Sequence, residues 1–269
     1  MSKRLTLSTL RAMPAAGEPI AALTAYDYSF AVALDAAGVD LVLVGDSLGM
    51  VMQGHASTVP VSVADMAYHT RCVARGLERA YLVVDMPFLS DTDSQLALAN
   101  AAVLMKEGGA DMVKVEASAA QAPIVAALSQ AGVPVCAHFG LRPQRVGQLG
   151  GYRVQGRGDA AVTQLLEDAD ALQAAGADLL LVECLDAAVT AQIRARIDVP
   201  LIGIGAGADC DGQILVLQDM LGLTAGAVPT FSHNFLADGG SISQALSAYV
   251  QAVKTRQFPG AEHTFSQHG

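Results

Sequence analysis

The chain has 269 residues, of which 52% are hydrophobic and 16% are charged, and its formal net charge at pH 7 is −10. This hydrophobic fraction excludes a disordered chain, and the acidic balance argues against binding to nucleic acid or to an anionic membrane, because both are negatively charged. The apolar stretches are broken by charged residues, Gly or Pro before they reach the roughly 18 residues of a spanning helix. The N-terminus lacks the sustained apolar run of a signal peptide.

The cysteines indicate a reducing compartment. They are Cys72, Cys136, Cys184 and Cys210, and none stands in CxxC spacing. A chain of this length can build a core without disulfides. We therefore expect reduced thiols in a cytoplasmic protein.

Short runs rich in Val, Ile and Leu predict eight strands, most of them apolar throughout, as in parallel sheets covered on both faces. In chain order they occupy residues 20–24, 39–45, 80–85, 111–116, 133–138, 178–184, 200–205 and 225–229. Ala-rich segments between them, such as 94–107 and 160–175, have the periodicity of helices. The sequence thus alternates strands and helices.

This alternation indicates an α/β protein with a (β/α)8 TIM barrel, whose usual length is about 250 residues. An open doubly wound sheet is the alternative. No Pro-, Gly- or Ser-rich linker divides the sequence, so we expect one domain over 1–269, with an N-terminal extension, a last helix at 242–256 and a C-terminal tail. Two long loops, 47–60 and 140–158, interrupt the pattern, and such loops are usually functional or disordered.

Polar residues stand where the apolar runs end, and in a barrel these strand ends form the active-site face. They are Asp46, Ser47, Asp85, Lys114, Glu116, His138 and Glu183. Residues two apart on a strand share a face, which places Lys114 with Glu116, and Asp46 with Val42 and Val44. If these faces point inward, four carboxylates converge beside one lysine.

Four buried carboxylates beside one lysine repel each other unless a cation joins them. Oxygen donors without clustered Cys or His favour a hard cation such as Mg²⁺ over Zn²⁺. Each residue also has a plainer interpretation. An Asp after a strand often caps the next helix, Lys114 could simply pair with Glu116, and His138 is more often a buried histidine in a supporting role.

Two further features have competing interpretations. The arginines of the 140–158 loop are more often surface or inter-subunit ion-pair partners than ligands; they are Arg142, Arg145, Arg153 and Arg157. The run Gly203-Ile204-Gly205-Ala206-Gly207-Ala208 fits the dinucleotide pattern GxGxxA, with Asp219 as a loosely spaced ribose acid. It follows the seventh strand rather than the first, so we favour close approach of a ligand or loop.

Longer motifs carry a resemblance to a known family. They are Leu23-Thr24-Ala25-Tyr26-Asp27-Tyr28, Val44-Gly45-Asp46-Ser47-Leu48-Gly49-Met50, Asp65-Met66-Ala67-Tyr68-His69, Asp85-Met86-Pro87-Phe88, Val113-Lys114-Val115-Glu116, Gly150-Gly151-Tyr152-Arg153-Val154-Gln155-Gly156-Arg157, Ile202-Gly203-Ile204-Gly205-Ala206-Gly207 and Asp211-Gly212-Gln213-Ile214-Leu215-Val216. From about Leu23 to the tail at Phe258-Pro259-Gly260, the sequence resembles the ketopantoate hydroxymethyltransferases.

The resemblance implies a (β/α)8 barrel of the phosphoenolpyruvate/pyruvate-binding type, Mg²⁺, and 5,10-methylenetetrahydrofolate as one-carbon donor. It also implies transfer of a hydroxymethyl group to 3-methyl-2-oxobutanoate, giving 2-dehydropantoate, a step of pantothenate biosynthesis in the cytoplasm. A homo-oligomer, typically a decamer, is implied as well.

By matching motif, Asp46, Asp85 and Glu116 resemble the family's metal-site residues. Asp46, Ser47, Asp85 and Lys114 resemble those that contact the α-keto acid, and Glu183 resembles the catalytic base. The sequence departs from the family pattern at Arg142, where the family often has Thr, and around residues 229–235, where it often has lysines. Both departures concern the outer folate site.

The implied chemistry is an enolate reaction. A metal on the keto-acid oxygens stabilises the enolate, Lys114 and Ser47 interact with substrate oxygens, and Glu183 removes the C3 proton. Four alternatives stay open. They are a metal-free aldolase with Lys114 as Schiff-base nucleophile, a carbon–carbon lyase of the same fold, a barrel that binds a ligand without turnover, and a nicotinamide oxidoreductase.

Overall fold

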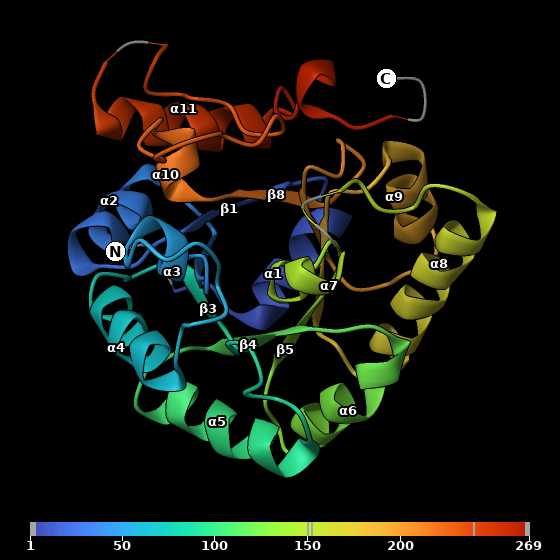
Figure 1. Ribbon diagram of the computed structural model, residues 1–269. Helices are drawn as coiled ribbons and strands as arrows, with labels where there is room; N and C mark the ends of the chain where they lie inside the picture. Colours follow the sequence, from blue (N-terminus) through green and yellow to red (C-terminus); the bar gives the residue numbers. More distant parts are fainter. Residues whose placement is uncertain (1–3, 150, 152, 239, 267–269) are drawn as a thin grey trace.

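Eight parallel strands form a closed barrel in the computed structural model, which describes residues 4–149, 151, 153–238 and 240–266 (Figure 1). Each strand pairs with the next one along the chain, and β1 pairs with β8 to close the barrel. The (β/α)8 prediction is therefore confirmed, and the open sheet is excluded. Gly150 and Tyr152 of the motif at 150–157 lie outside the described residues.

The strands alternate with helices that surround them (Figure 1). The strands are β1 Ile20–Thr24, β2 Leu41–Val44, β3 Tyr81–Asp85, β4 Met112–Glu116, β5 Val135–Gly140, β6 Leu179–Glu183, β7 Leu201–Ile204 and β8 Gly212–Leu215. The helices are α1 Leu7–Ala15, α2 Tyr28–Ala37, α3 Leu48–Val51, α4 Val63–Ala74, α5 Ser94–Lys106, α6 Ala122–Gln130, α7 Val146–Leu149, α8 Asp159–Ala174, α9 Ala187–Arg194, α10 Leu217–Met220 and α11 Ile242–Lys254. Three 3₁₀ turns span Ala119–Gln121, Pro143–Arg145 and Ala261–His263.

The eighth strand differs from the prediction. It is β8, whereas residues 225–229 form an irregular segment that follows α10. A regular alternation of strands and helices would place a helix after the seventh strand, but the described residues from Gly205 to Asp211 make turns and no helix. The eighth strand follows this short turn directly, so the apolar run at 225–229 is not part of the barrel.

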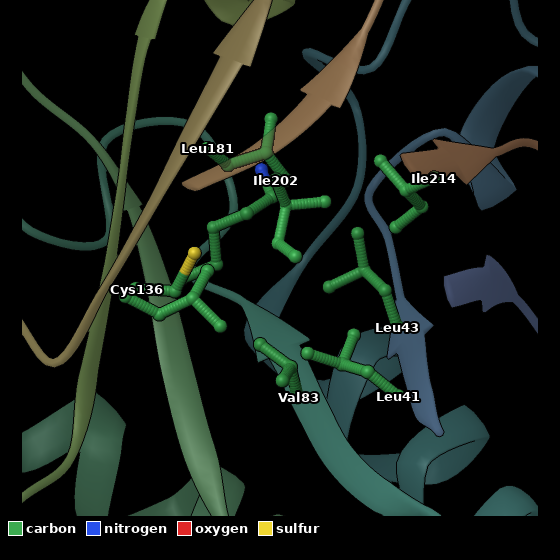
Figure 2. A pocket seen from close by; sticks show the side chains of 9 residues that line it. Leu41, Leu43, Val83, Cys136, Leu181, Ile202 and Ile214 are labelled. Atoms are coloured by element: carbon green, nitrogen blue, oxygen red, sulfur yellow. The ribbon is translucent and has the colours of Figure 1, made fainter. Parts of the chain in front are cut away.

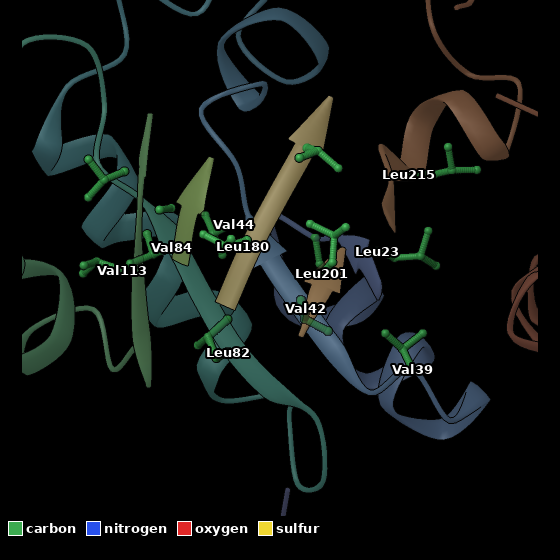
Figure 3. Close-up of a cluster of buried hydrophobic side chains, with 14 of the residues drawn as sticks. Leu23, Val39, Val42, Val44, Leu82, Val84, Val113, Leu180, Leu201 and Leu215 are labelled. Carbon is green, nitrogen blue, oxygen red and sulfur yellow. The ribbon is translucent and has the colours of Figure 1, made fainter. Parts of the chain in front are cut away.

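Side chains of the strands divide between two cores. One set points inward and includes Leu41, Leu43, Val83, Cys136 and Ile202; Figure 2 shows these side chains gathered inside the barrel. The other set, with Val42, Val44, Leu82, Val84 and Leu180, packs toward the helices (Figure 3). Both faces of each strand are thus buried, which explains the nearly continuous apolar runs.

Helix α1 covers the N-terminal ends of the strands. Its Leu10 and Met13 are buried and pack with the interior set, which includes Ile20 and Ala22 of β1. The N-terminal extension therefore serves as the lower cover of the barrel. Within the described residues, no helix combines the length and apolar character needed to cross a bilayer.

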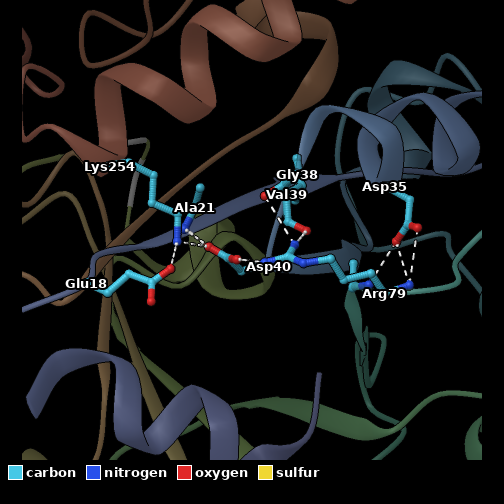
Figure 4. A network of polar contacts seen from close by, with 9 residues as sticks. Glu18, Ala21, Asp35, Gly38, Val39, Asp40, Arg79 and Lys254 are labelled. Atoms are coloured by element: carbon cyan, nitrogen blue, oxygen red, sulfur yellow. Dashed lines mark hydrogen bonds and ion pairs between the residues drawn. The ribbon is translucent and has the colours of Figure 1, made fainter. Parts of the chain in front are cut away.

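A buried carboxylate joins several elements near the same end of the barrel. Asp40, with 0% exposure, accepts a hydrogen bond from Ala21 N at 3.0 Å and lies 2.6 Å from both Arg79 Nη2 and Lys254 Nζ (Figure 4). Lys254 also pairs with Glu18 at 2.9 Å. This network ties α11 to the strands at the end opposite the polar residues of the sequence analysis.

Candidate active site

The polar residues that follow the strands converge on one cavity of about 760 Å³ at the C-terminal ends of the strands. Its inner part is lined by all seven residues singled out from the sequence: Asp46, Ser47, Asp85, Lys114, Glu116, His138 and Glu183. They come from the ends of β2 to β6. The structure therefore brings together every candidate site residue, while their individual roles stay predictions.

A row of contacts crosses the floor of this cavity. Lys114 Nζ lies 2.7 Å from Asp85 Oδ1 and 3.2 Å from His138 Nδ1. His138 Nε2 in turn lies 3.3 Å from Glu183 Oε2, outside hydrogen-bond geometry. The ammonium group thus connects the acid on β3 with the histidine on β5, and the histidine faces the acid on β6.

These contacts assign the proton on His138. A lysine ammonium can only donate, so Nδ1 of His138 accepts from Lys114. Burial lowers the pKa of His138 well below its usual value, and the positive charges of Lys114 and Arg142 lower it further. The neutral ring then carries its proton on Nε2, which faces the Glu183 carboxylate.

Gln144, in the turn after β5, links two of the other acids. Its Nε2 donates to Asp46 Oδ2 at 2.8 Å and to Met86 O at 2.9 Å. Its backbone N–H donates to both oxygens of Glu116, at 3.3 and 3.2 Å. Sequence reasoning missed Gln144, although it falls in the 140–158 loop, and loops of that length are usually functional or disordered.

Asp46 enters the cavity for a different reason than the sequence suggested. Val42 and Val44 face the helices and Leu41 and Leu43 face inward, so period-two alternation would turn Asp46 outward. The strand ends at Val44, and Asp46 lies in the turn that follows, where the alternation no longer applies. Its carboxylate accepts from Gln144, and the N-cap position of α3 belongs to Ser47.

Ser47 is held by an aromatic neighbour. Tyr26 Oη lies 2.9 Å from Ser47 Oγ, and His69 Nδ1 lies 2.7 Å from the carbonyl oxygen of Tyr26. Tyr26 is buried, and it follows β1 in the first motif of the resemblance. Its role in orienting the serine was not predicted, since a tyrosine beside a strand also suits an ordinary core.

The pKa values of three acids in the site are raised. Burial raises the pKa of Glu183 to about 8 and that of Asp46 to about 7, with Asp85 adding repulsion at Asp46. Burial, Asp46 and Asp85 also raise the pKa of Glu116 well above its usual value. Burial alone would lower the pKa of Lys114, but Asp85, Glu116 and Asp46 raise it. Without a further positive charge, Asp46, Glu116 and Glu183 therefore resist ionisation.

The glycines after β7 allow a neighbouring segment to pack closely against the end of this strand. A Cβ at Gly205 would lie 2.7 Å from the ring of Phe231, and Gly205 has a φ of 59°. The irregular segment after α10 can thus lie directly against the end of β7. This confirms close approach of a loop and accounts for the motif without a dinucleotide.

Comparison with known proteins agrees with this geometry. The family model of ketopantoate hydroxymethyltransferase matches residues 4–261. The 3-methyl-2-oxobutanoate hydroxymethyltransferase of Alkalilimnicola ehrlichii is 57% identical over 265 residues, covering 98% of this chain and 96% of that protein. The protein of the same name from Halorhodospira halophila is also 57% identical, covering 97% and 94%.

Solved structures support the barrel type. Phosphoenolpyruvate phosphomutase from Streptomyces platensis superposes with a TM-score of 0.62 at 14% identity, covering 81% of this chain and 83% of that chain. A 2,3-dimethylmalate lyase of the PEP mutase/isocitrate lyase superfamily gives 0.57 at 16% identity, covering 78% and 80%. At this identity the likeness concerns the fold. Family membership follows from the match of the family model to residues 4–261 and from the 57% identical relatives. The chain belongs to the ketopantoate hydroxymethyltransferase family.

Proposed function

We propose that the chain transfers a hydroxymethyl group from 5,10-methylenetetrahydrofolate to 3-methyl-2-oxobutanoate, giving 2-dehydropantoate for pantothenate biosynthesis in the cytoplasm. The observation that carries the proposal is the position of Glu183, a half-buried acid with a pKa of about 8, beside a cluster of acids and one lysine. Family membership and the names of the relatives support the substrate.

The acid cluster suits Mg²⁺. Among the described residues no group of three His, Cys, Asp or Glu side chains stands ready to hold an ion by itself. Mg²⁺, however, usually takes one or two carboxylates and completes its shell with water and substrate. Asp85 Oδ2 accepts the backbone N–H of Asp46 at 3.0 Å, both residues line the cavity, and the negative charge of Asp85 acts on the Asp46 carboxyl group.

We assign Asp46, Asp85 and Glu116 as the residues that would hold Mg²⁺. When bound, the ion supplies a positive charge for the oxygens of the α-keto acid. Burial raises the pKa values of Asp46 and Glu116, and repulsion by neighbouring acids raises them further. This supports the assignment, because a nearby cation would favour the ionised form of both groups.

Lys114 and Ser47 bind the α-keto acid in this proposal. The carboxylates around Lys114 keep it protonated, so it offers a positive charge and hydrogen-bond donors to substrate oxygens. The same protonation disfavours the Schiff-base alternative, which needs a neutral amine. Ser47 Oγ, fixed by Tyr26, presents a hydroxyl on the same cavity.

Glu183 is the catalytic base. It takes the proton from C3, and the electrons of that bond move toward the carbonyl of the substrate. C3 forms a bond to the methylene carbon, and the bonds of that carbon to the two folate nitrogens break. Water supplies the hydroxyl of the product, and tetrahydrofolate leaves with two protons on its nitrogens, one from water and one from Glu183. The Nε2 proton of His138 faces Glu183 and can orient the carboxylate during the transfer.

The proposal is tested by condensation of 3-methyl-2-oxobutanoate with 5,10-methylenetetrahydrofolate, followed by detection of 2-dehydropantoate. We expect product with Mg²⁺ and a loss of activity on chelation that Mg²⁺ restores. Product formation that persists under chelation, with covalent labelling of Lys114 by borohydride and substrate, would establish the aldolase alternative instead.

We also propose that the chain forms a homo-oligomer, typically a decamer. The apolar face of α1 packs under the barrel, and Phe258 packs against Phe235 and Tyr249, so both of these segments are used within the subunit. The loop with Arg153 and Arg157, both exposed, is the candidate interface segment. Light scattering at physiological salt should give a mass well above 27.7 kDa.

A further inference from the structure

The cavity continues outward beyond the acids and the lysine. Its outer part is lined by apolar side chains of two segments, Met50 and Val51 of α3 and Leu223, Val228 and Phe231 of the chain at 223–231 that follows α10. At about 760 Å³ the whole cavity falls in the range for drug-sized ligands, far more room than a five-carbon keto acid fills. A second and larger molecule therefore belongs in the outer part.

Two consecutive polar side chains of α10 face this outer part. Asp219 is 6% exposed, and its Oδ1 accepts a hydrogen bond from Thr224 Oγ1. Gln218 is 8% exposed, and its Nε2 lies 3.6 Å from Met52 Sδ, at the end of α3. Gln218 Oε1 is buried and lacks a hydrogen-bond partner within the described part of the chain. Buried polar atoms without partners are rare, and such an atom beside a cavity points to a ligand.

We propose that the outer part of the cavity binds the pterin ring of the folate, with the Asp219 carboxylate accepting hydrogen bonds from its aminopyrimidinone edge. This inference rests on the proposed function and names the subsite of its second substrate.

The assignment of Asp219 rests on the hydrogen-bond donors of the pterin ring. A reduced pterin presents its N3–H and its 2-amino N–H side by side, as two parallel donors. A carboxylate has about four acceptor sites on two oxygens, of which Thr224 uses one, so Asp219 can accept both. Gln218 Oε1 supplies a further acceptor. The flat, apolar body of the ring suits the side chains of α3 and of the segment around Phe231.

The position of Asp219 also agrees with transfer between the two substrates. Burial raises the pKa of Tyr26, and the negative charges of Asp85 and Asp219 raise it further, so both acids lie within electrostatic range of the Tyr26 hydroxyl. That hydroxyl bonds to Ser47, which belongs to the keto-acid subsite. A ring held at Asp219 would therefore occupy the same cavity as a keto acid bound at Ser47.

The charge of the cavity disfavours phosphate-bearing ligands such as nucleotides. Among the described residues that line it, Lys114 is the single Lys or Arg, and Asp85 already pairs with it. The carboxylates around the cavity would repel a phosphate. A neutral ring with outward-pointing donors is the better match.

The test is equilibrium binding of tetrahydrofolate and of its 2-desamino-2-methyl analogue to the wild type and to Asp219→Asn. In this variant the side-chain NH₂ group, a hydrogen-bond donor, would face the N–H donors of the pterin ring. We expect Asp219→Asn to bind tetrahydrofolate at least about tenfold more weakly, as loss of a hydrogen bond to a charged group predicts. The wild type should bind the analogue more weakly by a similar factor, and the variant should lose little further.

Asp209→Asn is the matched control, because Asp209 is exposed between β7 and β8 and does not line the cavity. It should bind tetrahydrofolate like the wild type. If thermal unfolding shows that Asp219→Asn does not fold, Thr224→Val, which removes the partner of Asp219, takes its place with an expected loss of about threefold.

The outcomes separate the two claims. Unchanged binding of tetrahydrofolate to Asp219→Asn, together with equal affinity of the wild type for both ligands, overturns the subsite and leaves the proposed function intact. Failure of the wild type to bind tetrahydrofolate at all overturns the folate step of the proposed function and the subsite with it.

Discussion

Glu183 combines an ionisable side chain with a position that makes it a stronger base than a carboxylate in water. Burial raises its pKa to about 8. Glu183→Gln keeps the side-chain volume but cannot accept a proton. We expect this variant to fold and to lose exchange of the C3 hydrogen of 3-methyl-2-oxobutanoate with deuterated solvent by about 10²–10⁴-fold, the usual contribution of a general base.

Glu167→Gln is the control for this substitution, since Glu167 is exposed on α8. It should exchange the C3 hydrogen at the wild-type rate. Wild-type exchange in Glu183→Gln would show that another group is the base.

The same pKa sets the pH dependence of the reaction. A base works only when ionised, so with a pKa of about 8 roughly one-tenth of Glu183 is active at pH 7. We expect kcat/KM for C3 exchange to rise with pH and to level off at or below about pH 8, because a bound cation lowers this pKa. His138 stays neutral in this range. A rate that falls as the pH rises from 6 to 8 would contradict the assignment.

The site residues could be predicted from the sequence where side-chain alternation reaches the end of a strand. Lys114, Glu116 and Glu183 occupy inward positions of β4 and β6, as expected. Asp46 lines the cavity although period-two alternation predicts the opposite face, because it lies in the turn after β2, where the alternation no longer applies. Gln144 acts through a long-range contact with Asp46, 98 residues away, which no local pattern encodes.

At the scale of elements, the strands with strong Val and Leu runs were predictable and β8 was not. Its four residues, Gly-Gln-Ile-Leu, include a glycine and a glutamine, and pairing with both β1 and β7 makes them a strand. Tertiary closure of the barrel thus overrides weak local preference.

Gly212 marks the tightest point of this closure. A Cβ there would lie 2.4 Å from Ile20 O and 2.7 Å from both Ile20 Cβ and Ile202 Cδ1. Because the nearest of these atoms belongs to the backbone of β1, the strands would have to separate. We expect Gly212→Ala to lower the free energy of unfolding by about 1–3 kcal/mol, as overpacking does, measured by urea denaturation.

Gly147→Ala provides the comparison. Gly147 lies in α7, is exposed, and a Cβ there meets no atom within 4 Å. Its replacement should leave stability unchanged or raise it slightly, because Ala favours helix over Gly. Equal effects of the two substitutions would show that the closure of β1 on β8 is not sterically limited.

Over the whole molecule, the two ends of the barrel use charge differently. The C-terminal ends of the strands gather carboxylates in excess, which raises their pKa values and suits a cation and substrates. Near the N-terminal ends, charges are paired, and in TIM barrels this end serves stability. The assignment of residues 1–269 to one domain stays a prediction, but the Asp40 network shows how the last helix is tied to the first strands.

The Asp40 network yields the last prediction, for stability without direct effect on chemistry. Asp40→Ala leaves the N–H of Ala21 and the charges of Arg79 and Lys254 without their shared partner, at a position with 0% exposure. Breaking a buried ion pair on one side costs about 3–5 kcal/mol. Urea denaturation should show a loss of this size, with the C3 exchange rate of the folded variant unchanged. Asp170→Ala, which removes an exposed pair with Arg196 at 3.7 Å, should cost under about 0.5 kcal/mol. A loss for Asp40→Ala as small as that for Asp170→Ala would mean that Arg79 and Lys254 reach water when the carboxylate is gone, and that α11 is held to the barrel by its apolar face alone.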